Sequence, residues 1–101
     1  MRSLAILGAT GSIGTQALDV VRSEPDAYEV VALGAASSVD LLAAQAHEFR
    51  PKVVAIADET RAHELEAKVP GGTEVVAGPS AFADVSTTAD VTLNGVVGFA
   101  G

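Results

Sequence analysis

Short apolar runs alternate with helix-forming segments along this chain, and this alternation most constrains its fold. The runs are rich in Val, Ala, Leu and Ile, as strands buried on both faces of a parallel sheet are. They predict strands over residues 4–7, 28–33, 53–57, 73–77 and 91–97, with a helix in each interval. Strands and helices that alternate in this way form a parallel sheet with right-handed crossovers. We therefore expect an α/β fold, with an open parallel sheet and helices on both of its faces.

Proline and capping residues mark the ends of the expected helices. The first helix runs from Ser12 to a stop at Pro25, and Pro51 and Pro70 end the next two. Ser37, three residues before Asp40, has the spacing of a capping box, and Asp58 is a suitable N-cap for the third helix. The apolar residues at helical spacing in the first helix, which we expect to face the sheet, are Ile13, Ala17, Val20 and Val21.

Composition excludes several classes of partner. The net charge is −7 and the pI about 4.5, so nucleic acid and anionic membranes are poor partners. The chain has no cysteine, which excludes disulfides and thiolate metal sites. The opening residues are too short an apolar run for a signal peptide, and no run is long enough to cross a membrane. We expect a soluble, cytoplasmic protein.

A glycine-rich turn between the first strand and the first helix is the strongest chemical signal. Gly8, Gly11 and Gly14 follow the spacing of a dinucleotide-binding, Rossmann-like turn. In such a turn the first glycine allows the tight bend, the second lets a pyrophosphate approach, and the third lets the helix pack closely. The amides of Gly11, Ser12 and Ile13, with the hydroxyls of Thr10 and Ser12, would then receive the phosphates. A glycine turn that binds nothing is the alternative.

The end of the second strand indicates which dinucleotide would bind. An acid there would bind the ribose diol of NAD and repel a 2′-phosphate. Residues 33–38 contain no acid, which favours NADP, and the hydroxyls of Ser37 and Ser38 could receive the phosphate. The same serines could equally serve only to cap the helix that follows. No Arg or Lys stands near them in the sequence.

Beyond these stretches the residues carry little chemistry. We expect the two histidines and six of the thirteen carboxylates to lie on solvated helix faces, without a metal site or catalytic group. They are His47, His63, Asp19, Asp58, Glu59, Glu64, Glu66 and Asp84. The small residues Asn94, Gly95, Gly98 and Gly101 could let the nicotinamide end of a cofactor lie against the backbone, or could form a plain turn.

Two stretches resemble the 1-deoxy-D-xylulose 5-phosphate reductoisomerase family. The first is residues 8–21, with Ser12-Ile13-Gly14 continuing into Leu18-Asp19-Val20-Val21, and the second is residues 93–101. The resemblance implies an NADPH-dependent enzyme of non-mevalonate isoprenoid synthesis. Such an enzyme rearranges its sugar phosphate and reduces the product to 2-C-methyl-D-erythritol 4-phosphate. The resemblance also implies a homodimer and a divalent metal, Mg or Mn, in the full-length protein.

The resemblance assigns cofactor contacts residue by residue. It implies that Thr10, Gly11, Ser12 and Ile13 hold the pyrophosphate region. Its second contact normally has a glycine, a variable residue and an asparagine, where this chain has Ala36, Ser37 and Ser38. The family's metal carboxylates, catalytic lysine and lid would all lie beyond Gly101. We therefore expect residues 1–101 to be a truncated cofactor-binding domain, without the catalytic and C-terminal domains and inactive alone.

Other readings of the glycine turn remain open. A short-chain dehydrogenase or sugar-nucleotide epimerase would show an acid or Arg after the second strand, and Tyr-x-x-x-Lys further on. A semialdehyde reductase would show a catalytic cysteine. A non-catalytic nucleotide-sensing module is the third alternative.

Overall fold

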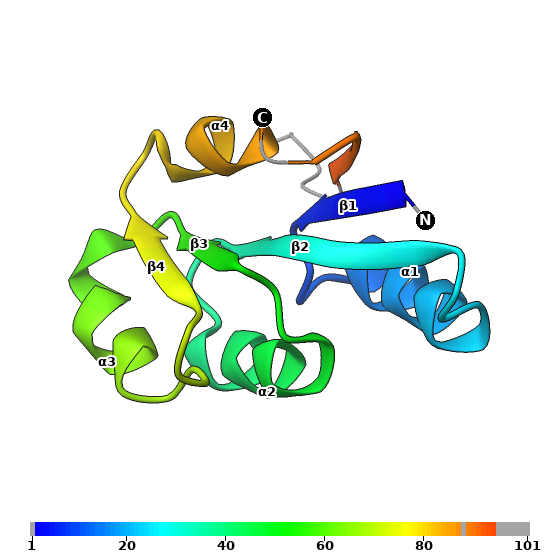
Figure 1. Ribbon diagram of the computed structural model, residues 1–101. Coiled ribbons are helices and arrows are strands. Elements are labelled where there is room, and N and C mark those ends of the chain that lie inside the picture. Colours follow the sequence, from blue (N-terminus) through cyan, green and yellow to red (C-terminus); the bar gives the residue numbers. More distant parts are fainter. Residues whose placement is uncertain (1, 88, 95–101) are drawn as a thin grey trace.

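A computed structural model describes residues 2–87 and 89–94 as five strands and the helices that join them (Figure 1). In chain order the elements are β1 Arg2–Leu7, α1 Ser12–Ser23, β2 Tyr28–Ala35, α2 Val39–Phe49, β3 Val53–Ile56, the 3₁₀ helix η1 Glu59–Arg61, α3 Ala62–Glu66, β4 Glu74–Ala77, α4 Ala81–Ser86 and β5 Val91–Asn94. Each predicted strand is present within a few residues of its expected bounds. The predicted continuation of the fifth strand, residues 95–97, lies outside the described residues.

The sheet is parallel throughout, with strand order β4-β3-β2-β1-β5. From β1 to β4 the chain steps in one direction, so right-handed crossovers put α1, α2 and α3 on one face. The chain then returns past β1 to β5, and this reversal puts α4 on the opposite face (Figure 1). The expected α/β sheet with helices on both faces is confirmed. The order reverses between β1 and β5, where ligands of open α/β sheets bind.

Two apolar clusters hold the layers together. The larger packs α1, α2 and α3 against the sheet through residues such as Leu18, Leu42 and Leu65, all fully buried. The smaller packs α4 on the other face through Ala81 and Val85. Small aliphatic side chains fill both clusters, as a chain with 4% aromatic residues requires.

The predicted apolar face of the first helix is confirmed for Val21, which is buried, and Ala17, which packs against the larger cluster, but is wrong for Ile13 and Val20. Gly14, Leu18 and Val21 are the buried positions of α1, whereas Ile13 and Val20 are 55% and 52% exposed. Apolar character alone selected Ile13 and Val20. The helix instead rotates to bring Gly14 against the loop before it, because only a glycine fits there.

Two helix starts also differ from prediction. The capping box is wrong: Ser38, not Ser37, is the N-cap position of α2, and it makes no side-chain capping bond. Asp40 pairs instead with Lys68. Asp58 does act as a cap, accepting from the Thr60 amide at 3.1 Å, but the segment begins with η1 before α3 continues it. Within the described residues, no helix is long and apolar enough to span a membrane.

Candidate dinucleotide-binding site

The loop between β1 and α1 lies at the sheet edge beside the reversal in strand order. Gly8 turns the chain with φ +79°, a conformation that favours glycine. The amides of Gly8 and Ala9 both donate to the carbonyl of Gly34 on β2, each at 2.8 Å. These bonds fasten the start of the loop to the sheet.

The other two glycines have different roles. A Cβ on Gly14 would lie 2.2 Å from the Gly8 carbonyl oxygen and 2.6 Å from the Ala9 Cα, so the protein itself demands glycine there. A Cβ on Gly11 would meet only the Gly8 oxygen, at an ordinary 3.5 Å, and φ is −86°. Nothing in the described structure therefore requires glycine at position 11. A glycine that protein packing does not require is expected where a ligand must approach the backbone closely.

The amides at the helix start differ in their partners within the protein. The Gly11 amide closes the turn by donating to the Gly8 carbonyl at 3.0 Å, so it is engaged within the protein. Gly11 is the N-cap of α1 and has no side chain with which to cap the helix, and the amides of Ser12 and Ile13 have no intrahelical partners. No acid lies in the first turn to oppose an anion. Thr10 is half-buried, and the next three residues are exposed.

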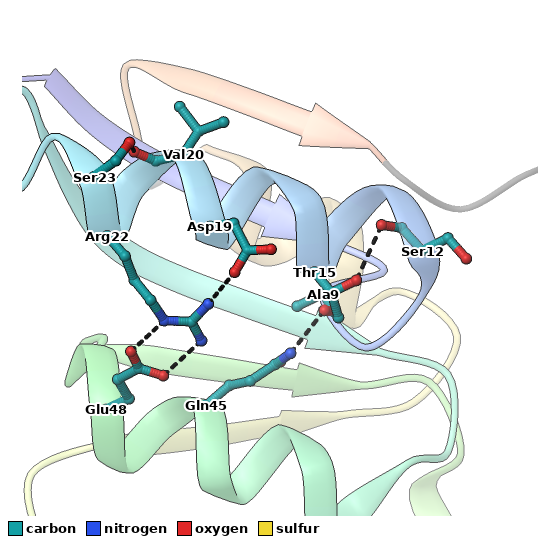
Figure 2. A network of polar contacts seen from close by, with 9 residues as sticks. All are labelled: Ala9, Ser12, Thr15, Asp19, Val20, Arg22, Ser23, Gln45 and Glu48. Atoms are coloured by element: carbon teal, nitrogen blue, oxygen red, sulfur yellow. Dashed lines mark hydrogen bonds and ion pairs between the residues drawn. The ribbon is translucent and has the colours of Figure 1, made fainter.

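A polar network behind the loop ties α1 to α2 (Figure 2). At one end the buried Gln45 donates from Nε2 to the carbonyl of Ala9 at 2.8 Å. At the other end Arg22 bridges Asp19 and Glu48, and its hydrogen bonds lower the pKa of the Glu48 carboxyl. Sequence reasoning missed Gln45. The available signal was a glutamine placed within the apolar stripe of its helix.

Residues Ala36, Ser37 and Ser38 lie exposed at the carboxyl end of β2, one strand away from the glycine loop. The absence of a side-chain cap at Ser38 argues against capping as its role. A backbone hydrogen bond joins this segment to the residues that follow β3: the Asp58 amide donates to the Ala36 carbonyl at 2.9 Å.

A cation also lies at this edge, which the sequence did not reveal. Arg61 follows β3 in η1, and it is within 3.8 Å of Asp58 and 3.4 Å of Glu64. Lys68 and, to a smaller extent, Arg61 lower the pKa of Asp40 in the first turn of α2. Arg61 is far from Ser37 in sequence, but neighbouring parallel strands bring their carboxyl ends to one edge.

Asn94 ends β5 beside Leu7 of β1, at the same edge. Gly95, Gly98 and Gly101, for which a nicotinamide contact and a plain turn were the two alternatives, lie outside the described residues. The predicted surface positions are confirmed for His47 and His63, both exposed. Within residues 2–87 and 89–94, no three His, Cys, Asp or Glu side chains converge to hold a metal.

Comparison with known proteins decides between the alternatives. The model of the family described as 1-deoxy-D-xylulose 5-phosphate reductoisomerase matches residues 4–101. This chain belongs to that family. The dehydrogenase, semialdehyde-reductase and sensing-module alternatives are not favoured.

Relatives in the reductoisomerase family agree over almost all of the chain. The reductoisomerase of Bacteroides fragilis is 48% identical over 103 residues, which are 99% of this chain and 26% of the relative. That of Anaeromyxobacter sp. (strain K) is 47% identical over 90 residues, 89% of this chain and 23% of the relative. The chain thus spans about a quarter of the length of these relatives.

Solved structures agree as well. The reductoisomerase from Zymomonas mobilis in complex with NADPH superposes with a TM-score of 0.91 at 36% identity, covering 99% of this chain and 27% of that one. A reductoisomerase in complex with NADPH, fosmidomycin and magnesium gives 0.82 at 35% identity, over 90% of this chain and 23% of that one.

Proposed function

We propose that this chain is the NADPH-binding part of a 1-deoxy-D-xylulose 5-phosphate reductoisomerase. The whole enzyme would rearrange its sugar phosphate and reduce the product to 2-C-methyl-D-erythritol 4-phosphate, with NADPH as the hydride donor. The observation that carries the proposal is the loop after β1, whose helix start is uncapped and whose Gly11 is not required by packing. Two of the matched reductoisomerase structures are complexes with NADPH, which supports the proposal.

The residues of the loop would bind and orient the cofactor. The amides of Ser12 and Ile13 would donate to the pyrophosphate, and the helix N-terminus would add its positive potential. The hydroxyls of Thr10 and Ser12 would supply further donors. Ile13, an exposed apolar side chain, would be covered by the bound dinucleotide.

The catalytic steps would need residues other than those described. Three of the matched reductoisomerase structures are complexes with magnesium, and no cluster of carboxylates or histidines in residues 2–87 and 89–94 fits that ion. We propose that the chain corresponds to a cofactor domain of a longer protein, because it spans about a quarter of its relatives. Sugar-phosphate binding and homodimer formation would belong to that longer protein.

The test is a titration of the 101-residue chain with NADPH and with NADH, followed by protein-detected NMR. We expect tighter binding of NADPH, because residues 36–38 carry no acid to repel a 2′-phosphate. The amides that shift most should be those of residues 8–14. Equal affinities would contradict the NADPH preference, and shifts that avoid this loop would contradict the site.

Arg61 provides a second prediction, about the 2′-phosphate. We propose that its guanidinium supplies the cation for this group, in place of a cation next to Ser37. Hydrogen bonds from Thr60 lower the pKa of Asp58, whose carboxylate lies 3.8 Å from the Arg61 guanidinium at this edge. Replacement of Arg61 with glutamine should weaken NADPH binding by about three- to tenfold and leave NADH binding unchanged.

Lys52→Gln is the matched control for Arg61→Gln. Lys52 is exposed just before β3 begins, at the opposite edge of the sheet, and its replacement changes the net charge equally. Equal losses for both cofactors, or the same loss in the control, would show that Arg61 does not read the 2′-phosphate.

A further inference from the structure

Gln45 is a buried polar residue to which the proposed function has so far given no role. It is 5% exposed and is the one buried polar or charged side chain of residues 2–87 and 89–94. From α2 it reaches across to the glycine loop, 36 residues earlier in sequence, and donates from Nε2 to the Ala9 carbonyl (Figure 2). The contact therefore joins a second helix to the loop proposed to hold the pyrophosphate.

The bond determines which way one peptide unit of the loop faces. Among the described residues there are no cis peptide bonds, so the carbonyl of Ala9 and the amide of Thr10 point in opposite directions. Because the carbonyl points at Gln45 and α2, the Thr10 amide points away from α2. Ala9 is fully buried and Gly11 is exposed, so the chain emerges from the core across this peptide unit.

Ala9 is held at both of its backbone polar groups. Its amide donates to Gly34 on β2 at 2.8 Å, while its carbonyl accepts from Gln45 at 2.8 Å. The first bond alone leaves the Ala9–Thr10 peptide able to rotate about the ψ angle of Ala9. The bond from Gln45 removes that freedom.

The energetics of Gln45 favour a positioning role over a stabilising one. Its Oε1 is buried without a hydrogen-bond partner in the described part of the chain. A buried acceptor left unsatisfied offsets much of what the Nε2 bond contributes. A variant with an apolar side chain of similar size at position 45 would therefore fold about as well as the parent chain. It would, however, leave the Ala9 carbonyl unrestrained.

We propose that Gln45 is a positioning residue that sets the Ala9–Thr10 peptide so that the Thr10 amide faces the bound pyrophosphate. This inference rests on the proposed NADPH function. It adds a donor, the Thr10 amide, to those of Ser12 and Ile13. It also gives α2, through Gln45, a part in shaping the pyrophosphate site.

The test replaces Gln45 with methionine, which keeps the length of the side chain and removes its donor. We expect the affinities for NADPH and NADH to fall by the same factor, about tenfold, because both cofactors share the pyrophosphate. The ratio of the two affinities should stay as in the parent chain. The melting temperature should change by only a few degrees. Gln16→Met, on the exposed side of α1, is the control and should change neither the cofactor affinities nor the melting temperature.

Three outcomes of the titrations would overturn the proposal. One is a Gln45→Met variant that binds both cofactors as well as the parent chain. Another is a variant whose melting temperature falls while the affinity of its folded fraction does not. A changed NADPH to NADH ratio would likewise count against a pyrophosphate role.

Measurements on the unliganded chain separate this proposal from the proposed function. In Gln45→Met the amide resonance of Thr10 should shift or broaden, and in Gln16→Met it should not. In the unchanged chain a scalar coupling across the hydrogen bond should join Gln45 Nε2 to the Ala9 carbonyl carbon. This measurement needs no variant, so it tests the contact even if Gln45→Met does not fold. Failure of the parent chain to bind NADPH, with these signals present, would reject the cofactor function and retain the loop contact. Absence of the coupling and of the Thr10 shift would reject the positioning role.

Discussion

Replacing Gly14 with alanine is expected to lower the free energy of unfolding by about 3 kcal/mol or more, the upper part of the range for overpacking. The new Cβ would lie 2.2 Å from the Gly8 carbonyl oxygen and 2.6 Å from the Ala9 Cα. Both are backbone atoms, which cannot move aside as the end of a flexible side chain can. The helix would have to leave the loop, although alanine by itself favours a helix over glycine by about 1 kcal/mol. Thermal unfolding should show a melting temperature lower by about 12–24 °C.

Gly71→Ala is the control for Gly14→Ala. A Cβ on Gly71 would meet no atom within 4 Å, and φ there is not positive, so alanine should be neutral or stabilising by about 0.5 kcal/mol. A Gly14→Ala chain that melts with the parent would show that α1 does not pack against the loop as described.

Replacing Gly11 with alanine is expected to weaken NADPH binding by about 10- to 100-fold while the chain folds normally. The Cβ would make only an ordinary contact with the protein, at 3.5 Å from the Gly8 oxygen. It would instead occupy the space through which a pyrophosphate approaches the helix start. The measurement is a cofactor titration, with the melting temperature recorded on the same sample.

Gly71→Ala again serves as the comparison, since it adds the same methyl group away from the loop. Unchanged affinity in Gly11→Ala would mean that phosphates do not approach at Gly11. A large fall in melting temperature would instead mean that the described packing around Gly11 is wrong. Gly14→Ala and Gly11→Ala thus separate the structural glycine from the ligand-facing one.

Much of the fold was predictable because it depends on local patterns. Short aliphatic runs such as residues 4–7 and 53–57 are too short for helices and too apolar for exposed strands, so they predicted buried parallel strands. Pro25 and Pro51 marked helix ends because proline disrupts a helix interior. The spacing of Gly8, Gly11 and Gly14 indicated the candidate site for the same reason, since each glycine acts on its own short stretch of backbone.

The predictions were wrong where a residue's burial or hydrogen-bond partner depended on contacts with other segments of the chain. Ile13 and Val20 were expected to be buried for their apolar character, but the rotation of α1 is set by the contact of Gly14 with the preceding loop. Asp40 was expected in a capping box, but Lys68, 28 residues later, pairs with it.

The sequence by itself determined the alternation of elements, the glycine turn and the family resemblance, because each is written in contiguous residues. Tertiary structure alone decided that Gln45 holds the Ala9 carbonyl and that Arg61 lies at the edge that carries Ser37 and Ser38. These residues are separated by tens of positions from the groups they serve. Only the parallel order of β1, β2 and β3, with α2 packed beneath them, brings the pieces to one edge.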